Sequence, residues 1–247
     1  MTREPLQIME ILGRSEQGLT RPFLCRCEDG NLYYVKGRGA GRRSLFSEWL
    51  AGHLAQALGL PVPPFALVQA LPSLVRLHPE GGDLGSQPAF GSRKVDHTQD
   101  LTISHIRDVP VPMRRDVLVF DWWIHNTDRT LTTHSGNPNL LWGADDEGLV
   151  VIDHNTAFDP TFDPRAFCET HIFSEEIPAV FHDLVEPIAY VGRLQKALAA
   201  WPDACQNVPV EWWFADKERT VPANFDPNVE LALLNRCTGP AFWKLAT

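Results

Sequence analysis

The sequence predicts an α+β fold with two lobes: a small N-terminal antiparallel sheet with one helix, and a mostly helical C-terminal lobe. Three observations lead to this class. Short β-rich runs separated by glycine-bearing turns fill most of the chain before residue 70. A stretch rich in Gly, Pro and Ser follows, from about Pro72 to Ser92. Beyond it, most apolar residues recur at helical spacing.

The N-terminal lobe is expected to span residues 1–78. Its helix is predicted from about Ser44 to Leu58, because large apolar residues recur there at helical spacing and Gly59 follows as a stop signal. Ser44 is the expected N-cap. The predicted strands are Leu6–Leu12, Pro22–Cys27, Leu32–Val35 and one further strand before Ala70.

The C-terminal lobe is expected to span residues 79–247. The stretch from Pro72 to Ser92 is predicted to join the lobes and to form an irregular loop. An apolar helix is predicted at Met113–Asn126, and a strand pair at Asn139–Trp142 and Leu149–Ile152. The remainder, which is rich in tryptophan, predicts packed helices.

Composition excludes several classes of protein. The chain has 247 residues, a formal net charge of -9 and a pI of about 5.4, so direct nucleic-acid binding is not expected. No apolar run reaches membrane-spanning length, and the N-terminus lacks the pattern of a secretory signal, which predicts a cytoplasmic location. The five cysteines show no CxxC pair, and Cys25 and Cys27 are predicted to pack inside a sheet.

Charged residues stand at the ends of several predicted elements. Lys36 ends the strand Tyr33-Tyr34-Val35-Lys36, and Glu48 lies on the helix that follows. A lysine at a strand end can reach a phosphate while its stem packs on the sheet, and a glutamate on the next helix can hold it in place. A solvated lysine at a strand end would show the same pattern.

A second group of polar residues follows apolar elements in the C-terminal lobe. Asp128 and Arg129 come after the apolar helix, Asn139 precedes a strand, and Asp153 follows one. Phosphoryl transfer requires a carboxylate for the acceptor hydroxyl and oxygen ligands for magnesium. Asp153 alone would equally suit the cap of a turn.

The order of these motifs resembles that of the HipA-like kinases and, more distantly, the phosphatidylinositol kinases. The resemblance covers residues 33–158 and is carried by YYVKG, LFSEWLAGHLAQALGLPVPP, FDWWIHNTDR, NPNLL and LVVIDHNTAF. It implies a two-lobed protein-kinase-like fold. The HipA toxins are longer and carry an N-terminal subdomain, so the chain looks like a core-only member.

Carried over residue by residue, the resemblance implies ATP and Mg²⁺ as cofactors. Lys36 would hold the phosphates and Glu48 would pair with it, while Asp128 would be the catalytic carboxylate. Asn139 and Asp153 would bind magnesium. The turn between the first two strands would cover the nucleotide through Gly13, Ser15 and Gly18.

Some assignments stay open at this point. The loop from Asp128 to Asn139 is longer than in most relatives, which makes Asn137 a rival for the metal-binding role of Asn139. Arg129 is expected to steady the loop or a phosphate. Asp121 in the apolar helix is interpreted as a packing residue without a chemical role.

The predicted function is an ATP-dependent phosphotransferase, a HipA-like serine/threonine protein kinase that acts on a hydroxyl of a protein or a small molecule. A regulatory protein partner is a further expectation from the family. Two alternatives remain: a small-molecule or lipid kinase, and a nucleotide-binding pseudokinase or partner-binding module.

Overall fold

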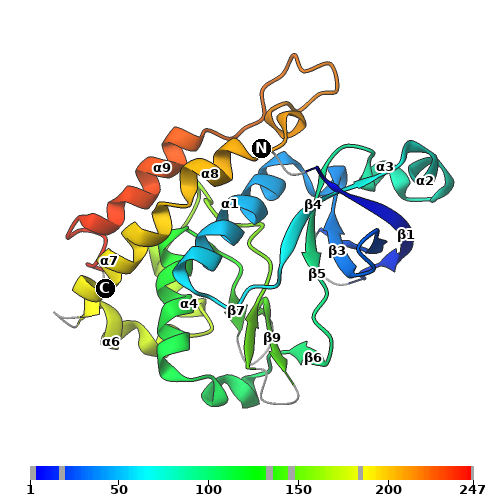
Figure 1. Ribbon diagram of the computed structural model, residues 1–247. Coiled ribbons are helices and arrows are strands. Elements are labelled where there is room, and N and C mark those ends of the chain that lie inside the picture. The colour runs from blue at the N-terminus through cyan, green and yellow to red at the C-terminus, as the bar shows by residue number, and fades with distance from the viewer. Residues whose placement is uncertain (1–3, 17–19, 132–135, 144–147, 183–185, 246–247) are drawn as a thin grey trace. The chain divides into compact units, whose positions relative to one another are not determined.

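The computed structural model describes residues 4–16, 20–131, 136–143, 148–182 and 186–245 (Figure 1). The chain divides into two compact units, with the division falling inside helix α1 (Arg42–Leu58) after Trp49. The first unit contains residues 1–49, 63–96 and 204–225, and the second contains residues 50–62, 97–203 and 226–247. The mixed α+β class is confirmed. The division into lobes of residues 1–78 and 79–247 stays a prediction.

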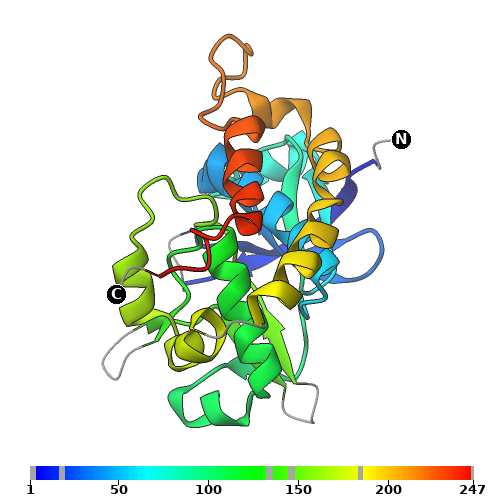
Figure 2. The same cartoon turned by 90° about the vertical axis from the view of Figure 1, so that its left-hand side faces the viewer.

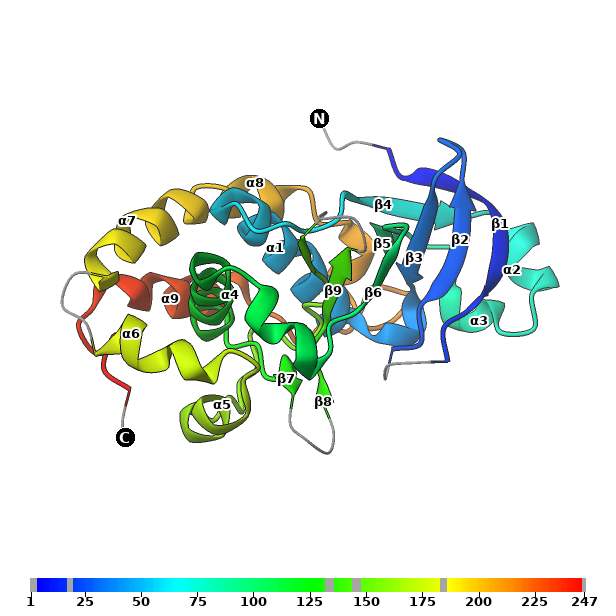
Figure 3. The ribbon, with the colours of Figure 1, turned by 90° about the horizontal axis from the view of Figure 1, so that it is seen from below.

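The first unit is built on a closed barrel, whose strands follow the order β1-β2-β3-β5-β4. Neighbouring strands are antiparallel, as predicted, except β1 and β4, which run parallel and were not predicted to do so. Figure 3 shows β1, β2 and β3 side by side. The bounds are β1 Leu6–Arg14, β2 Phe23–Cys27, β3 Leu32–Lys36, β4 Phe65–Ala70 and β5 Ala89–Arg93.

The interior of the barrel contains Cys25 and Cys27, as predicted, together with apolar residues of all its strands. Burial raises the pKa of each thiol to about 12, so both stay protonated and pack as small apolar groups.

The stretch predicted as an irregular loop is regular in the structure. It forms helix α2 (Pro72–Leu77), helix α3 (Gly81–Leu84) and strand β5, which lies between β3 and β4. Leu84 belongs to the barrel core, and Leu74 and Val75 pack against it. The prediction failed because β5 reads AFGSR, which has little β propensity by itself and is stabilised by a partner strand on each side.

Helix α1 begins at Arg42, so Ser44 lies in its first turn and is not the N-cap that was predicted. Its Oγ atom is buried and has no hydrogen-bond partner among the described residues. Phe46 on this helix stacks on Phe225 and contacts the rings of Trp212 and Trp213.

The second unit is organised around helix α4 (Val111–Trp123). Figure 2 shows α4 beside α7 (Glu186–Leu198) and α9 (Pro227–Asn235). The indole N–H of Trp123 donates to the carbonyl of Leu234 at 2.8 Å, and Arg193 forms an ion pair with Asp116 at 2.6 Å. Three further α-helices are α5 (Pro164–Thr170), α6 (Ile177–Phe181) and α8 (Trp201–Gln206). The division between the two units falls within α8.

A small sheet in this unit has the order β10-β9-β6, and β7 pairs with β8. The predicted strand pair is therefore present as β9 and β10. The bounds are β6 Thr98–Asp100, β7 Thr130–Leu131, β8 Gly136–Asn137, β9 Leu140–Gly143 and β10 Leu149–Val151. No helix in the described parts of the chain is long and apolar enough to cross a membrane.

Candidate active site

The predicted site residues fall into two groups, one in each unit, and each group is described separately. Lys36, Glu48, Gly13 and Ser15 belong to the first unit. Asp128, Asn139 and Asp153 belong to the second.

In the first unit, Lys36 and Glu48 form a buried ion pair. Nζ of Lys36 lies 2.5 Å from Oε1 of Glu48, and the side chains are 8% and 2% exposed. Lys36 is the last residue of β3 and Glu48 lies on α1, so a strand and the following helix supply the two charges. The predicted pairing is confirmed. Contact of Lys36 with a phosphate stays a prediction.

The backbone directly after Lys36 has no room for a side chain. A Cβ atom on Gly37 would lie 2.2 Å from the carbonyl oxygen of Leu84 in α3. Glycine is therefore required at this position by close backbone approach, although its φ of -100° is open to any residue. The YYVKG motif thus ends β3 against α3.

The predicted nucleotide-covering turn differs from expectation at its first residue. Gly13 lies within β1 and pairs with Leu24 of β2, so it is part of the sheet and not of the turn. The backbone N–H of Ser15 donates to the carbonyl of Pro22 at 2.9 Å and closes the base of the connection. Gly18 lies outside the described residues.

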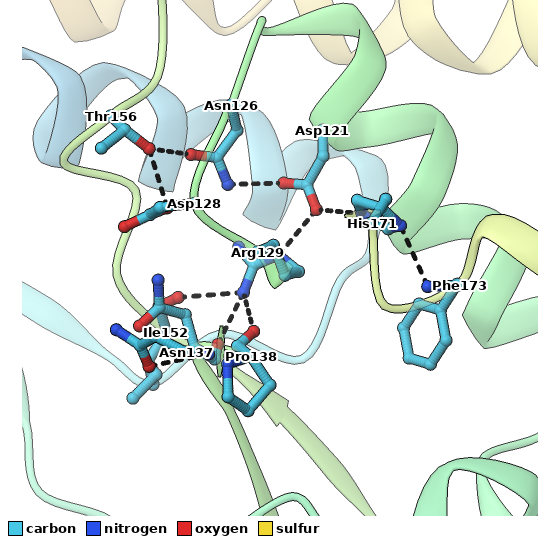
Figure 4. A network of polar contacts seen from close by, with 11 residues as sticks. Asp121, Asn126, Asp128, Arg129, Asn137, Pro138, Ile152, Thr156, His171 and Phe173 are labelled. Atoms are coloured by element: carbon cyan, nitrogen blue, oxygen red, sulfur yellow. Dashed lines mark hydrogen bonds and ion pairs between the residues drawn. The ribbon is translucent and has the colours of Figure 1, made fainter. Parts of the chain in front are cut away.

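In the second unit, a buried hydrogen-bond network surrounds Asp121 of α4 (Figure 4). Its Oδ2 atom accepts from Nε of Arg129 at 2.6 Å and contacts Nε2 of His171 at 3.0 Å, and its Oδ1 atom accepts from Nδ2 of Asn126 at 2.9 Å. Asp121 and Arg129 are fully enclosed. We call these four residues the Asp121 hub.

The charges of the hub follow from its contacts. Burial alone would raise the pKa of Asp121, but the Arg129 charge and the His171 hydrogen bond outweigh it and hold the pKa at about 2. Burial lowers the pKa of His171. The backbone N–H of Phe173 donates a hydrogen bond to Nδ1 of His171. Nε2 therefore carries the proton of the neutral ring and donates a hydrogen bond to Asp121.

Arg129 also binds the backbone at the ends of two strands. Its Nη1 atom donates to the carbonyls of Asn139 at 2.6 Å, Ile152 at 3.2 Å and Pro138 at 3.3 Å. These contacts fix the residue before β9 and the residue before Asp153. Arg129 thus holds the end of the loop at Pro138 and Asn139, and its contact with a phosphate stays a prediction.

Asn139 and Asp153 both adopt left-handed backbone conformations, with φ of 49° and 55°. Asn and Asp tolerate this region better than other residues with side chains, and such conformations cluster at functional sites. The N–H of Ile152 donates to the carbonyl of Asn139 at 3.1 Å, which links the two positions. Their side chains therefore leave adjacent strands where the chain turns sharply.

Asp128 lies near both of these residues. Its pKa is raised, first by burial and next by the negative charge of Asp153. Asn139 is near enough to Asp128 to favour the ionised form, but the geometry falls short of a hydrogen bond: Nδ2 of Asn139 is buried and has no hydrogen-bond partner among the described residues. The structure thus brings Asp128, Asn139 and Asp153 together.

Asn137 has a different place. It lies in β8 with an exposed side chain, and its Oδ1 atom accepts weakly from the N–H of Asn139 at 3.4 Å. Asn139, by contrast, is 5% exposed and close to Asp128. This geometry favours Asn139 as the candidate metal ligand.

The sequence did not point to four residues of this region. The interpretation of Asp121 as a packing residue was incomplete, because it accepts three hydrogen bonds at the centre of the hub. A buried aspartate in an apolar helix requires a cationic partner, and this requirement was the available signal. Asn126, Thr156 and His171 carry no comparable sequence signal.

A comparison with protein-family models agrees with the motifs. A family model described as HipA-like kinase matches residues 8–246. The chain belongs to the HipA-like kinase family. The resemblance drawn from the motifs is therefore confirmed, and family membership supports a kinase activity.

Among solved structures, the Helicobacter pylori proinflammatory kinase CtkA is similar to this HipA-like chain. The match covers 96% of this chain and 95% of that chain, with 12% sequence identity and a TM-score of 0.46. The comparison with curated proteins gives no match.

Proposed function

We propose that the chain is an ATP-dependent serine/threonine protein kinase that transfers the γ-phosphate of ATP to a protein hydroxyl with Mg²⁺ as cofactor. The observation that carries the proposal is that Asp128, Asn139 and Asp153 come from three separate segments and lie close together, in a member of the HipA-like kinase family. Arg129 supports this convergence by binding the carbonyls of Asn139 and Ile152.

Magnesium fits the residues present. Asp153 and Asn139 offer carboxylate and amide oxygens, the hard ligands that Mg²⁺ prefers. Burial and, next, the negative charge of Asp153 raise the pKa of Asp128, and a divalent cation would relieve the repulsion between the two carboxylates. Among the described residues no cluster of three or more His, Cys, Asp or Glu side chains is placed to hold a metal. That finding is compatible with Mg²⁺, which keeps several waters and binds substrate phosphates.

The proposed roles follow from chemistry and burial. Asp128 would orient the acceptor hydroxyl and accept its proton, while Asn139 and Asp153 would hold the metal. Bound Mg²⁺ supplies positive charge that offsets the charge developing on the transferred phosphoryl group. Lys36, held by Glu48, would contact the phosphates as an ammonium group whose position is fixed before ATP binds.

The acceptor class rests on the family. A HipA-like chain is expected to phosphorylate a serine or threonine of a protein, and a regulatory protein partner is part of the same proposal. A degenerate peptide library with a fixed serine or threonine tests the acceptor class, because it presents the hydroxyl in many flanking sequences at once.

Nucleotide binding is tested by thermal unfolding with ATP, in the presence and absence of Mg²⁺. Saturation at one hundred times the dissociation constant stabilises a protein by about 2.7 kcal/mol, so the wild type should show a metal-dependent rise in Tm. Asp153→Asn should lose the metal-dependent part. Asp100→Asn, on an exposed residue of β6, is the matched control and should behave as wild type. An equal rise in Tm for the wild type with and without Mg²⁺ would contradict the metal role.

Phosphate transfer is tested with γ-labelled ATP and the peptide library. Asp128→Asn should lower transfer by about 10²- to 10⁴-fold, the range for loss of a general acid or base. Full transfer by this variant would remove Asp128 from the proposed role. Transfer to a lipid headgroup or a small molecule, with none to peptides, would replace the acceptor class.

A further inference from the structure

A chain of hydrogen bonds connects the buried Asp121 hub to Asp128. Asn126 donates from Nδ2 to Oδ1 of Asp121 at 2.9 Å. On its other side, the Oγ1 atom of Thr156 lies 2.6 Å from Oδ1 of Asn126 and 2.7 Å from Oδ1 of Asp128. Figure 4 shows the four side chains in this order.

The direction of the first bond is fixed by charge. Asp121 is ionised, because its pKa is held at about 2, and an ionised carboxylate only accepts hydrogen bonds. Asn126 must therefore turn its NH₂ group toward Asp121 and its carbonyl oxygen toward Thr156. The backbone N–H of Asn126 also donates to the carbonyl of Asp121 at 2.9 Å, which holds the residue in place.

Thr156 then faces two acceptors with a single proton. Its hydroxyl can donate to Asn126 or to Asp128, but to only one of them at a time. In its proposed role as proton acceptor Asp128 is ionised, and an ionised carboxylate is a stronger acceptor than an amide oxygen, so donation to Asp128 is favoured. That bond fixes Oδ1 of Asp128 on the side of the hub.

We propose that Thr156 is a positioning residue for Asp128. Its hydroxyl holds one carboxylate oxygen, so that the other is presented to the acceptor hydroxyl in a single orientation. This inference rests on the proposed function, because it assigns the orientation a role in phosphate transfer. Thr156 itself touches neither ATP nor the acceptor in this proposal.

The decisive variant is Thr156→Val, which removes the hydroxyl and keeps the shape of the side chain. A lost hydrogen bond to a charged group should lower kcat for the peptide library by about ten- to a hundredfold. The KM for ATP should stay within about twofold, because a residue that orients only the catalytic carboxylate contributes little to nucleotide binding.

Two further variants separate positioning from general damage. Thr156→Ser keeps the hydroxyl and should retain most of the wild-type kcat. Thr161→Val removes an exposed hydroxyl that bonds Asp159 at 2.7 Å, and it should leave kcat unchanged. A fall in kcat for Thr156→Ser as large as that for Thr156→Val would overturn the role of the hydroxyl.

A readout in the free protein tests the contact without ATP. The unfolding equilibrium constant is measured by urea for wild type, Thr156→Val, Asp128→Ala and the double variant. If the hydroxyl bonds Asp128, the two single effects should be non-additive by about tenfold. Additive effects would overturn the hydrogen bond itself.

The outcomes distinguish this inference from the proposed function. If the wild type transfers phosphate and Thr156→Val has the same kcat, the positioning role is overturned and the kinase proposal is left intact. A raised KM for ATP at unchanged kcat overturns it as well, because it moves Thr156 to nucleotide binding. An inactive wild type whose Thr156 and Asp128 are still coupled in the free protein overturns the kinase proposal, and the positioning role with it.

Discussion

The ion pair Lys36–Glu48 of the first unit and the ion pair Asp121–Arg129 of the second are both buried, but they are built differently. Lys36 ends a strand, and its ammonium group is held by a carboxylate on the next helix. Arg129 shares Asp121 with Asn126 and His171, and it also donates to three backbone carbonyls.

The two buried ion pairs therefore suit different roles. The ammonium of Lys36 is a compact charge with three donors, suited to a phosphate. The planar guanidinium of Arg129 is used as a scaffold that fixes the strand ends next to Asn139 and Asp153. Variants of the first pair should therefore affect ligand binding, whereas variants of the second should affect folding.

The largest effect is expected for Asp121→Asn. The change leaves the Arg129 charge buried without its carboxylate, and breaking a buried ion pair costs about 3 to 5 kcal/mol. Urea unfolding should show this loss, while Asp100→Asn on an exposed strand should change the free energy of unfolding little. Wild-type stability for Asp121→Asn would refute the scaffold role.

The same carboxylate should make the second unit sensitive to acid. The pKa of Asp121 is held at about 2 in the folded protein, below its ordinary value of 3.8. A depressed pKa contributes stability above pH 4, and this contribution is lost as the pH falls from about 4 to about 2. The contribution is about 2 kcal/mol, and it should be missing from the pH dependence of Asp121→Asn, measured by urea unfolding at each pH.

The glycine that follows Lys36 gives a test of the first unit. Gly37→Ala would place a Cβ atom 2.2 Å from the carbonyl oxygen of Leu84, so it should destabilise the protein by about 1 to 3 kcal/mol. Gly192, within α7, has nothing within 4 Å of a built Cβ atom. Gly192→Ala is thus the control, and its effect on stability should be opposite to that of Gly37→Ala. It should stabilise the protein by up to about 1 kcal/mol in thermal unfolding.

The smallest expected effect is on ATP affinity. Glu48→Gln removes the charge that holds Lys36, and binding of Mg-ATP should weaken by about tenfold in calorimetric titration. Glu211→Gln is the matched control, because Glu211 pairs with Arg219 at the surface. Unchanged affinity for Glu48→Gln would indicate that the pair is structural, and the contrast with the Asp121 hub would disappear.

Local patterns in the sequence were sufficient for several elements. Helix α1, strands β2 and β3, and the β9–β10 pair follow from hydrophobic periodicity and turn residues. The order of Lys36, Glu48, Asp128, Asn139 and Asp153 was sufficient to predict the family that the comparison confirms. These features depend on neighbours in the chain, which a sequence shows directly.

The course of the chain around the barrel was decided only by tertiary structure. Strand β5 lies between β3 and β4, and Gly91 in it resembles a turn residue. A Cβ atom at Gly91 would lie 2.8 Å from the side chain of Val68, so the glycine serves close packing inside the sheet. Such pairing joins residues far apart in the chain, which local propensity cannot reveal.

The sequence by itself therefore determined the family, the mixed α+β class and the residues that bear the proposed chemistry. Tertiary structure decided which side chains orient them: Asp121, Asn126, Thr156 and His171 are brought together from α4 and three loop segments. The physical reason is that a buried charge must be matched by partners wherever the fold places them. Those partners are set by contacts in space and have no fixed spacing in the chain.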